Sequence, residues 1–144
     1  RDMAFIAAAG PASNVVQFLC WYIVLVIVNL CTRGFPESLD PLIRVLIGIC
    51  VGGLLVNACL TVFNLLPIPP LDGSRIIRAF LPAEGALWLG RLEMSGLGFI
   101  LLIGLMYLGV LGWILAPVFI VIISMLLPLG PDVWVVVKEI FGMR

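Results

Sequence analysis

Three long apolar stretches constrain the fold of this chain more than any other feature. They cover about residues 3–31, 42–66 and 97–127. A helix needs about 20 apolar residues to cross the roughly 30 Å hydrocarbon core of a bilayer, and each stretch exceeds that length. The bilayer core contains no water to satisfy an open backbone, so only helices and closed barrels span it. Unbroken apolar runs of this length predict an all-α, polytopic membrane protein.

The composition agrees with this prediction. Hydrophobic residues make up 63% of the 144 residues and charged residues 11%, whereas soluble globular domains are about half apolar and a quarter charged. The length predicts one membrane-embedded domain over residues 1–144, with the lipid bilayer as a partner. The formal net charge is zero and the basic residues form no cluster, so we do not expect a nucleic-acid partner.

The third stretch, residues 97–127, is too long for one straight span and too short for two. Gly112 and Pro117 interrupt it, so we predict a span plus a short returning or interfacial helix, and about three transmembrane helices in all. If this stretch turns back, six of the eight Lys and Arg residues fall on one side and two on the other. The positive-inside rule then places the loop 67–95 in the cytoplasm.

A polar face runs along the end of the second stretch. Asn57, Thr61 and Asn64 are four and three residues apart, a spacing that puts them on one side of a helix. Such a face serves either as the polar wall of a site or as hydrogen-bonding contact between membrane helices. The spacing alone does not decide between these two interpretations.

A proline-rich segment follows this face. Pro67, Pro69 and Pro70 each fix their own φ angle and push the preceding residue towards extended backbone. We therefore expect an extended strand over residues 66–70, which could accept hydrogen bonds from an unwound substrate segment. The alternative is a plain loop that ends the helix at the membrane surface.

Asp72 lies directly after these prolines. An ionisable residue next to membrane-spanning sequence is a candidate for a functional site. It is also a good N-cap for a short helix over residues 73–80. The residues alone favour the cap, because a single carboxylate does not hold a transition metal.

The sequence contains no histidine, which removes the commonest metal ligand and the usual general base. It has four cysteines and no Cys-x-x-Cys pair, so a thiolate zinc site has little support. We expect the cysteines to be small side chains within the membrane; they are Cys20, Cys31, Cys50 and Cys59.

These motifs resemble the site-2 protease family of intramembrane zinc metallopeptidases. The run from Phe63 to Gly73, Phe-Asn-Leu-Leu-Pro-Ile-Pro-Pro-Leu-Asp-Gly, is similar to that family's Asn-x-x-Pro…Leu-Asp-Gly motif. The run from Ala9 to Asn14, Ala-Gly-Pro-Ala-Ser-Asn, resembles its Ala-Gly-Pro-x-x-Asn helix. The later pattern Leu-Pro…Arg-Leu-Glu…Gly over residues 81–96 fits the small bacterial members that lack a PDZ domain. Together the motifs cover most of the chain in the family's order.

The resemblance implies a role for each matching residue. Asp72 becomes the third zinc ligand, and Asn64 becomes the amide that steadies the substrate or the developing oxyanion. Asn14 becomes a second, weaker polar candidate near the site. The residues implied to hold the substrate segment are Pro67, Ile68, Pro69 and Gly73.

The family's first motif, His-Glu-x-x-His, is missing because the chain has no histidine. That motif supplies two zinc ligands and the general base. We expect an amino-terminal truncation, so that the missing catalytic helix is a partner and this chain holds one ligand of three. Alone, it should neither bind zinc tightly nor cleave a peptide. The intact protein is expected to be a Zn²⁺-dependent endopeptidase of the bacterial plasma membrane that cuts transmembrane proteins.

Two other hypotheses remain open. The chain could be a non-catalytic membrane scaffold of the same family, which the missing histidines favour equally well. It could also be a fragment of a transporter, since broken helices with a midplane carboxylate bind ions and substrates there.

Overall fold

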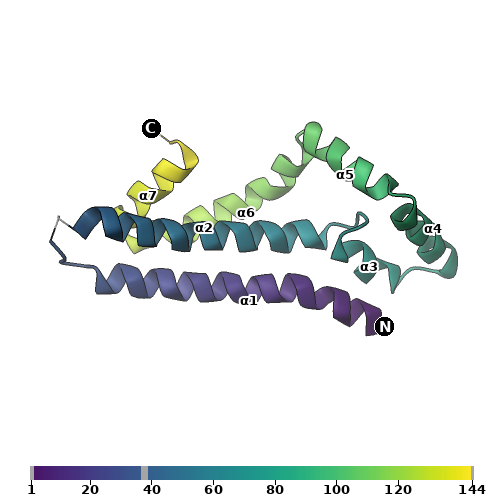
Figure 1. Ribbon diagram of the computed structural model, residues 1–144, viewed down its shortest axis with the longest axis horizontal. Helices are drawn as coiled ribbons and strands as arrows, with labels where there is room; N and C mark the ends of the chain where they lie inside the picture. The colour runs from purple at the N-terminus through teal and green to yellow at the C-terminus, as the bar shows by residue number, and fades with distance from the viewer. Residues whose placement is uncertain (1, 37–38, 144) are drawn as a thin grey trace. The chain divides into compact units, whose positions relative to one another are not determined.

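The structure is a computed structural model that describes residues 2–36 and 39–143. Every regular element in these two ranges is a helix, and none is a strand, so the predicted all-α class is confirmed (Figure 1). The elements are α1 (Asp2–Cys31), α2 (Asp40–Leu65), α3 (Asp72–Arg78), α4 (Ala83–Met94), α5 (Leu97–Tyr107), α6 (Val110–Leu126), the 3₁₀ turn η2 (Leu127–Leu129) and α7 (Pro131–Phe141).

Three helical segments are long and apolar enough to cross a membrane. They are Met3–Cys31, Asp40–Leu65 and Val110–Leu129. The pair α4 and α5 passes the same test only when taken together, and it is bent by 78°. The protein is therefore an integral membrane protein with three candidate spans and additional shorter helices, as predicted.

The third apolar stretch breaks at a different place from the one expected. The chain leaves α5 at Leu108 and turns at Gly109, whose φ is +73°. Glycine adopts this left-handed conformation without a steric cost. Gly112 and Pro117, which we expected to break the stretch, both lie inside α6. The 20 residues of Val110–Leu129 are consequently long enough to span.

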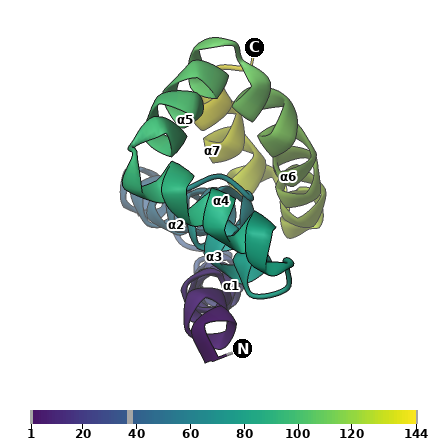
Figure 2. The same cartoon turned by 90° about the vertical axis from the view of Figure 1, so that its right-hand side faces the viewer.

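The contacts within the chain divide it into two compact units. Unit 1 comprises Arg1–Val15 and Cys59–Ala116, and unit 2 comprises Val16–Ala58 and Pro117–Arg144. These units describe packing and leave the predicted single domain untested. Unit 1 contains α3, α4 and α5, and Figure 2 shows α5 leading away from α4 at a sharp angle.

The largest cluster of buried apolar side chains lies in unit 2. It joins parts of α1, α2, α6 and α7, and Gly53 allows close packing because a Cβ there would collide with the Trp21 ring. The fully buried members are Leu25, Ile47, Val51, Leu54, Ile122, Leu126, Val133 and Val137.

Within unit 2, α7 packs beside the beginning of α2. The Arg44 guanidinium pairs with Glu139 at 3.5 Å. At the same end, the Asn29 amide donates a 2.8 Å hydrogen bond to the Leu129 carbonyl. The tail therefore lies beside the beginning of α2 within unit 2.

The arrangement in which the third stretch turns back stays a prediction. The charge count of the sequence supports it, because six of the eight Lys and Arg residues then fall on one side. The cytoplasmic position of the loop 67–95 stays a prediction with it.

Candidate functional site

The segment between α2 and α3 is a tight reversal of the chain. The Leu71 N–H donates to the Ile68 carbonyl at 2.9 Å, and the Pro69–Pro70 peptide bond between them is cis. A cis proline at this position is the defining feature of a type VI turn. The Leu66 N–H also turns back, to the Phe63 carbonyl at 3.1 Å. The expected extended strand over residues 66–70 is therefore wrong.

Gly73 fixes where α3 begins. It is buried, and a Cβ on it would collide with the backbone carbonyls of Leu65 and Leu66. Only glycine permits backbone to approach backbone this closely. The start of α3 is consequently held against the carboxyl-terminal end of α2, and Asp72 is the residue immediately before this contact.

The Asp72 carboxylate lies against α1 at Gly10. A Cβ on Gly10 would be 2.6 Å from the Asp72 Oδ2 atom, so the missing side chain makes room for the carboxylate. Asp72 is half-buried, and within the described ranges it has no hydrogen-bond or ion-pair partner. Removing an ionised carboxylate from water is costly unless it is paired or coordinates a metal. This carboxylate is thus available to a ligand.

The cap interpretation of Asp72 is contradicted. The N-cap of α3 is Leu71, with extended backbone angles and no side-chain cap hydrogen bond. Asp72 lies in the first turn, where a negative charge is still favourable because of the helix dipole. Capping therefore does not explain why an acidic residue occupies this position.

Asn14 and Asn64 lie on the two helices that contact the segment around Asp72. Asn14 is four residues after Gly10, on the same face of α1 and about 6 Å further along its axis. Asn64 lies in the last turn of α2, next in sequence to Leu65, whose carbonyl meets Gly73. Both amides are half-buried and make no hydrogen bond with another described residue. All three polar candidates belong to unit 1, and their roles stay predictions.

The polar face of α2 is not uniform. Asn57 is buried, and its amide donates a 2.8 Å hydrogen bond to the Gly53 carbonyl within the same helix. Asn57 and Thr61 each take part in a further polar interaction. The Asn57 bond lies within α2, so it does not decide between the wall of a site and a contact between helices. Asn64 is the member of this face nearest to Asp72 in the sequence.

The residues predicted to hold substrate have different surroundings. Pro67 is exposed and Ile68 half-buried, whereas Pro69 and Gly73 are buried. The Pro69 carbonyl lies where a Cβ on Gly98 would be, so it packs on the start of α5. Their roles in substrate binding stay predictions, and Pro69 and Gly73 have packing roles in addition.

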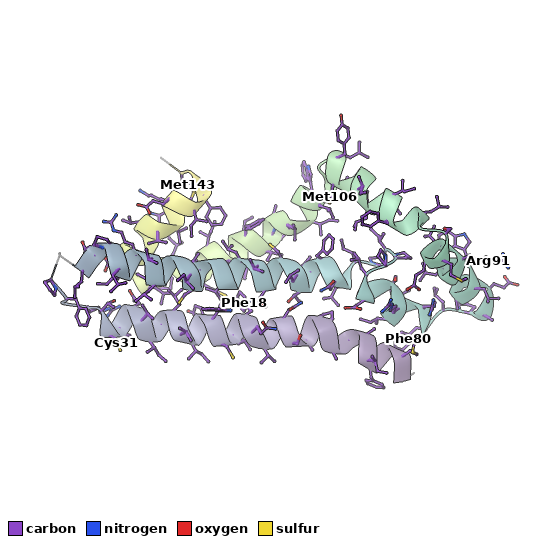
Figure 3. The ribbon with its side chains drawn as sticks, in the orientation of Figure 1. Phe18, Cys31, Phe80, Arg91, Met106 and Met143 are labelled. Atoms are coloured by element: carbon purple, nitrogen blue, oxygen red, sulfur yellow. The ribbon has the colours of Figure 1, made fainter. Side chains whose placement is uncertain are left out.

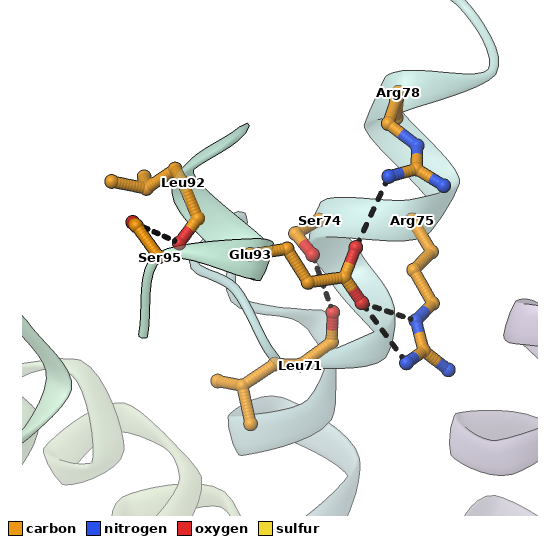
Figure 4. A network of polar contacts seen from close by, with 7 residues as sticks. All are labelled: Leu71, Ser74, Arg75, Arg78, Leu92, Glu93 and Ser95. Atoms are coloured by element: carbon orange, nitrogen blue, oxygen red, sulfur yellow. Dashed lines mark hydrogen bonds and ion pairs between the residues drawn. The ribbon is translucent and has the colours of Figure 1, made fainter. Parts of the chain in front are cut away.

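Glu93 links α3 to α4 through a pair of arginines. Its Oε1 accepts hydrogen bonds from Arg75 Nε at 3.3 Å and Nη2 at 3.1 Å, and its Oε2 accepts one from Arg78 Nη1 at 3.1 Å (Figure 4). At the base of α3, the Ser74 hydroxyl donates to the Leu71 carbonyl at 2.8 Å. These bonds fix the short helix that carries Asp72. Sequence analysis missed this contact, although the i, i+3 spacing of the two arginines places them on one face.

The comparison with known families covers this part of the chain. Residues 46–108 match the model of Peptidase family M50, and they include most of α2, the proline turn, Asp72 and α3 to α5. This match confirms the resemblance to the site-2 protease family that the motifs indicated.

Two relatives support the same family. The chain is 33% identical over 81 residues to "Putative zinc metalloprotease YwhC" of Bacillus subtilis (strain 168), a match that covers 54% of this chain and 34% of the relative. It is 36% identical over 73 residues to "Putative zinc metalloprotease MJ0611" of Methanocaldococcus jannaschii, covering 51% and 32%. The chain thus spans about a third of the length of these relatives. No solved structure matches the chain.

The described residues do not bring together the ligands of a catalytic zinc site. Such a site has three protein ligands and one open position. Across residues 2–36 and 39–143, no group of three or more His, Cys, Asp or Glu side chains could hold a metal, and the sequence has no histidine. The role of Asp72 as one ligand stays a prediction.

Proposed function

We propose that this chain supplies the Asp72 carboxylate to the metal centre of an intramembrane zinc endopeptidase. The position of that carboxylate supports the proposal. It is half-buried, it has no partner among the described residues, and it packs against Gly10. The remaining ligands and the general base would come from residues outside the printed sequence. The chain alone should neither hold zinc tightly nor cleave.

Three features of the chain would serve this function by fixing the geometry of the carboxylate. Gly73 sets the start of α3 against α2, Gly10 leaves space on α1, and Glu93 anchors α3 from the other side. A metal ligand held by packing and by hydrogen bonds keeps its position without a metal present. The half-buried state of Asp72 limits the water around it.

Asn64 and Asn14 would bind the peptide rather than the metal. The peptide groups of a transmembrane helix are all paired within the helix, so a substrate must unwind before it is cut. The unwound peptide then needs new hydrogen-bond partners, because unpaired polar groups in the membrane are costly. Two free amides beside Asp72 supply donors and acceptors for it. The substrate would be a transmembrane protein of a bacterial plasma membrane.

The test uses the full-length gene product and a transmembrane reporter substrate. Asp72→Asn keeps the size of the side chain and removes its charge, and we expect cleavage to fall below detection. The matched control is Asp132→Asn, an exposed aspartate of α7 in unit 2, which should leave the rate unchanged. Cleavage by the Asp72→Asn protein at a rate near that of the wild type would refute the proposal.

A second candidate function is a non-catalytic membrane scaffold of the same family. The observation that favours it is the absence of histidine from the sequence. In that case the full-length gene product binds the unwound segment of a membrane protein, retains no zinc and cleaves nothing. The same reporter assay, combined with a binding measurement, separates the two functions.

A further inference from the structure

A groove on the surface of unit 1 has a lining of which the proposed protease function uses only Arg78. It has a volume of about 560 Å³ and lies along α4 and the end of α3. Two arginines, Arg78 and Arg91, line it together with small or apolar residues, and its lining contains no carboxylate. The groove is therefore positively charged at one edge and apolar elsewhere.

Gly90 keeps the groove open beside Arg78. A Cβ on Gly90 would lie 3.4 Å from the Arg78 Nη1 atom, so any larger side chain would fill this part of the groove. The same Nη1 donates to Glu93 at 3.1 Å, which fixes the position of the guanidinium. The groove is thus shaped by a glycine and by an arginine that is held in place.

Arg91 supplies a charge that the protein does not neutralise. It is exposed, and among the described residues it has no hydrogen-bond or ion-pair partner. Figure 3 shows its side chain projecting from α4. A guanidinium presents several N–H donors in a planar fork that matches the oxygens of a phosphate. Two such groups on one groove are suited to a phosphate anion.

The surroundings of the groove indicate which kind of molecule carries that phosphate. Leu87 is 62% exposed, Trp88 64% and Met94 91%, and exposed apolar side chains of this size mark a binding surface. Tryptophan with arginine is the combination typical of the membrane–water interface, where the ring meets the headgroups and the cation reaches phosphate. Because the protein has three candidate membrane spans, lipid headgroups are available to it as ligands.

We propose that this groove binds an anionic phospholipid, with its phosphate between Arg91 and Arg78 and its acyl chain on Leu87 and Met94. Basic pockets next to membrane helices are known to recognise lipid headgroups in this way. The proposal does not rest on the protease function, because Arg78, which helps to hold α3, is the only groove residue that function uses.

The test is a lipid titration of the full-length gene product in detergent, followed by native mass spectrometry. We expect phosphatidylglycerol to bind more tightly than phosphatidylcholine. Arg91→Gln should weaken the binding of phosphatidylglycerol about fivefold, as expected for one basic residue at a lipid surface. Gly90→Leu should weaken both lipids by filling the groove. Arg33→Gln, which changes an exposed arginine of unit 2, is the control and should change nothing.

Three results would overturn the proposal. The first is equal binding of the two lipids by the wild-type chain. The second is an equal effect of Arg91→Gln and Arg33→Gln, which would indicate general attraction to charge. The third is displacement of phosphatidylglycerol by millimolar inorganic phosphate, which would identify a site for free phosphate. Circular dichroism of each variant checks that the helices are intact. If Gly90→Leu does not fold, the comparison of Arg91→Gln with Arg33→Gln still tests the proposal.

Discussion

The Asp72 carboxylate occupies the space that a side chain on Gly10 would need. The two residues are on different helices, α3 and α1, and a Cβ on Gly10 would lie 2.6 Å from the Asp72 Oδ2 atom. This contact brings the Ala-Gly-Pro run and the Leu-Asp-Gly run of the sequence together in unit 1. It gives a physical reason for glycine at position 10 and leads directly to a prediction.

Gly10→Ala should displace the Asp72 carboxylate without changing its chemistry. A shift of about 1 Å in a catalytic group can lower a rate about 100-fold, so we expect a loss of this order in kcat/KM for a reporter substrate. The assay uses the full-length gene product. Gly52→Ala is the matched control, because a Cβ there meets nothing within 4 Å. Equal rates for the two variants would contradict the contact.

Gly73→Ala should destabilise unit 1. The new Cβ would collide with the carbonyls of Leu65 and Leu66, and backbone atoms cannot yield as a flexible side chain can. Overpacking of this kind costs about 1–3 kcal/mol in the free energy of unfolding. Thermal unfolding in detergent measures the effect. The control is Gly104→Ala in α5, where a Cβ meets nothing, and a gain in helix propensity should keep its stability the same or raise it.

Glu93→Gln should loosen α3 while leaving the rest of the chain folded. The substitution removes the charge that holds both Arg75 and Arg78, whose side chains are partly exposed (45% and 32%). Water screens such pairs, so we expect a loss of about 1 kcal/mol. Hydrogen exchange of the α3 amides should become faster. Glu84→Gln, an exposed change at the start of α4, should leave exchange in α3 as it was.

The tail and the loop 67–95 should lie on the same side of the membrane if the third stretch turns back. The charge count favours this arrangement, because it puts six of the eight Lys and Arg residues on one side. The measurement is labelling by a membrane-impermeant thiol reagent in a chain whose four native cysteines are replaced. Ser95→Cys and Asp132→Cys should react from the same side. Labelling of the two from opposite sides would contradict the turned-back arrangement.

The long helices could be predicted because their cause is local. A span depends on the length of an apolar run, and that length is read directly from residues 3–31 and 42–66. The position of a break inside an apolar stretch depends on tertiary structure. Pro117 lies inside α6, and the chain turns instead at Gly109, which the sequence did not distinguish from Gly112.

The candidate site was only partly predictable for the same reason. The motif identified Asp72 and Asn64, because the residue types and their order are specific. It did not predict the turn closed by Leu71 and Ile68, since the fixed φ of each proline and its effect on the preceding residue indicated extended backbone. The contacts of Gly10 with Asp72 and of Gly98 with Pro69 join residues far apart in the sequence, and only the fold brings them together.

The zinc content of the full-length gene product tests the central claim most directly. Elemental analysis of the purified wild-type protein should find about one zinc per chain, since a catalytic site of this class holds a single ion. The Asp72→Asn protein should lose that zinc on dialysis, while the Asp132→Asn protein keeps it. Full retention of zinc by Asp72→Asn would show that this carboxylate is not a metal ligand.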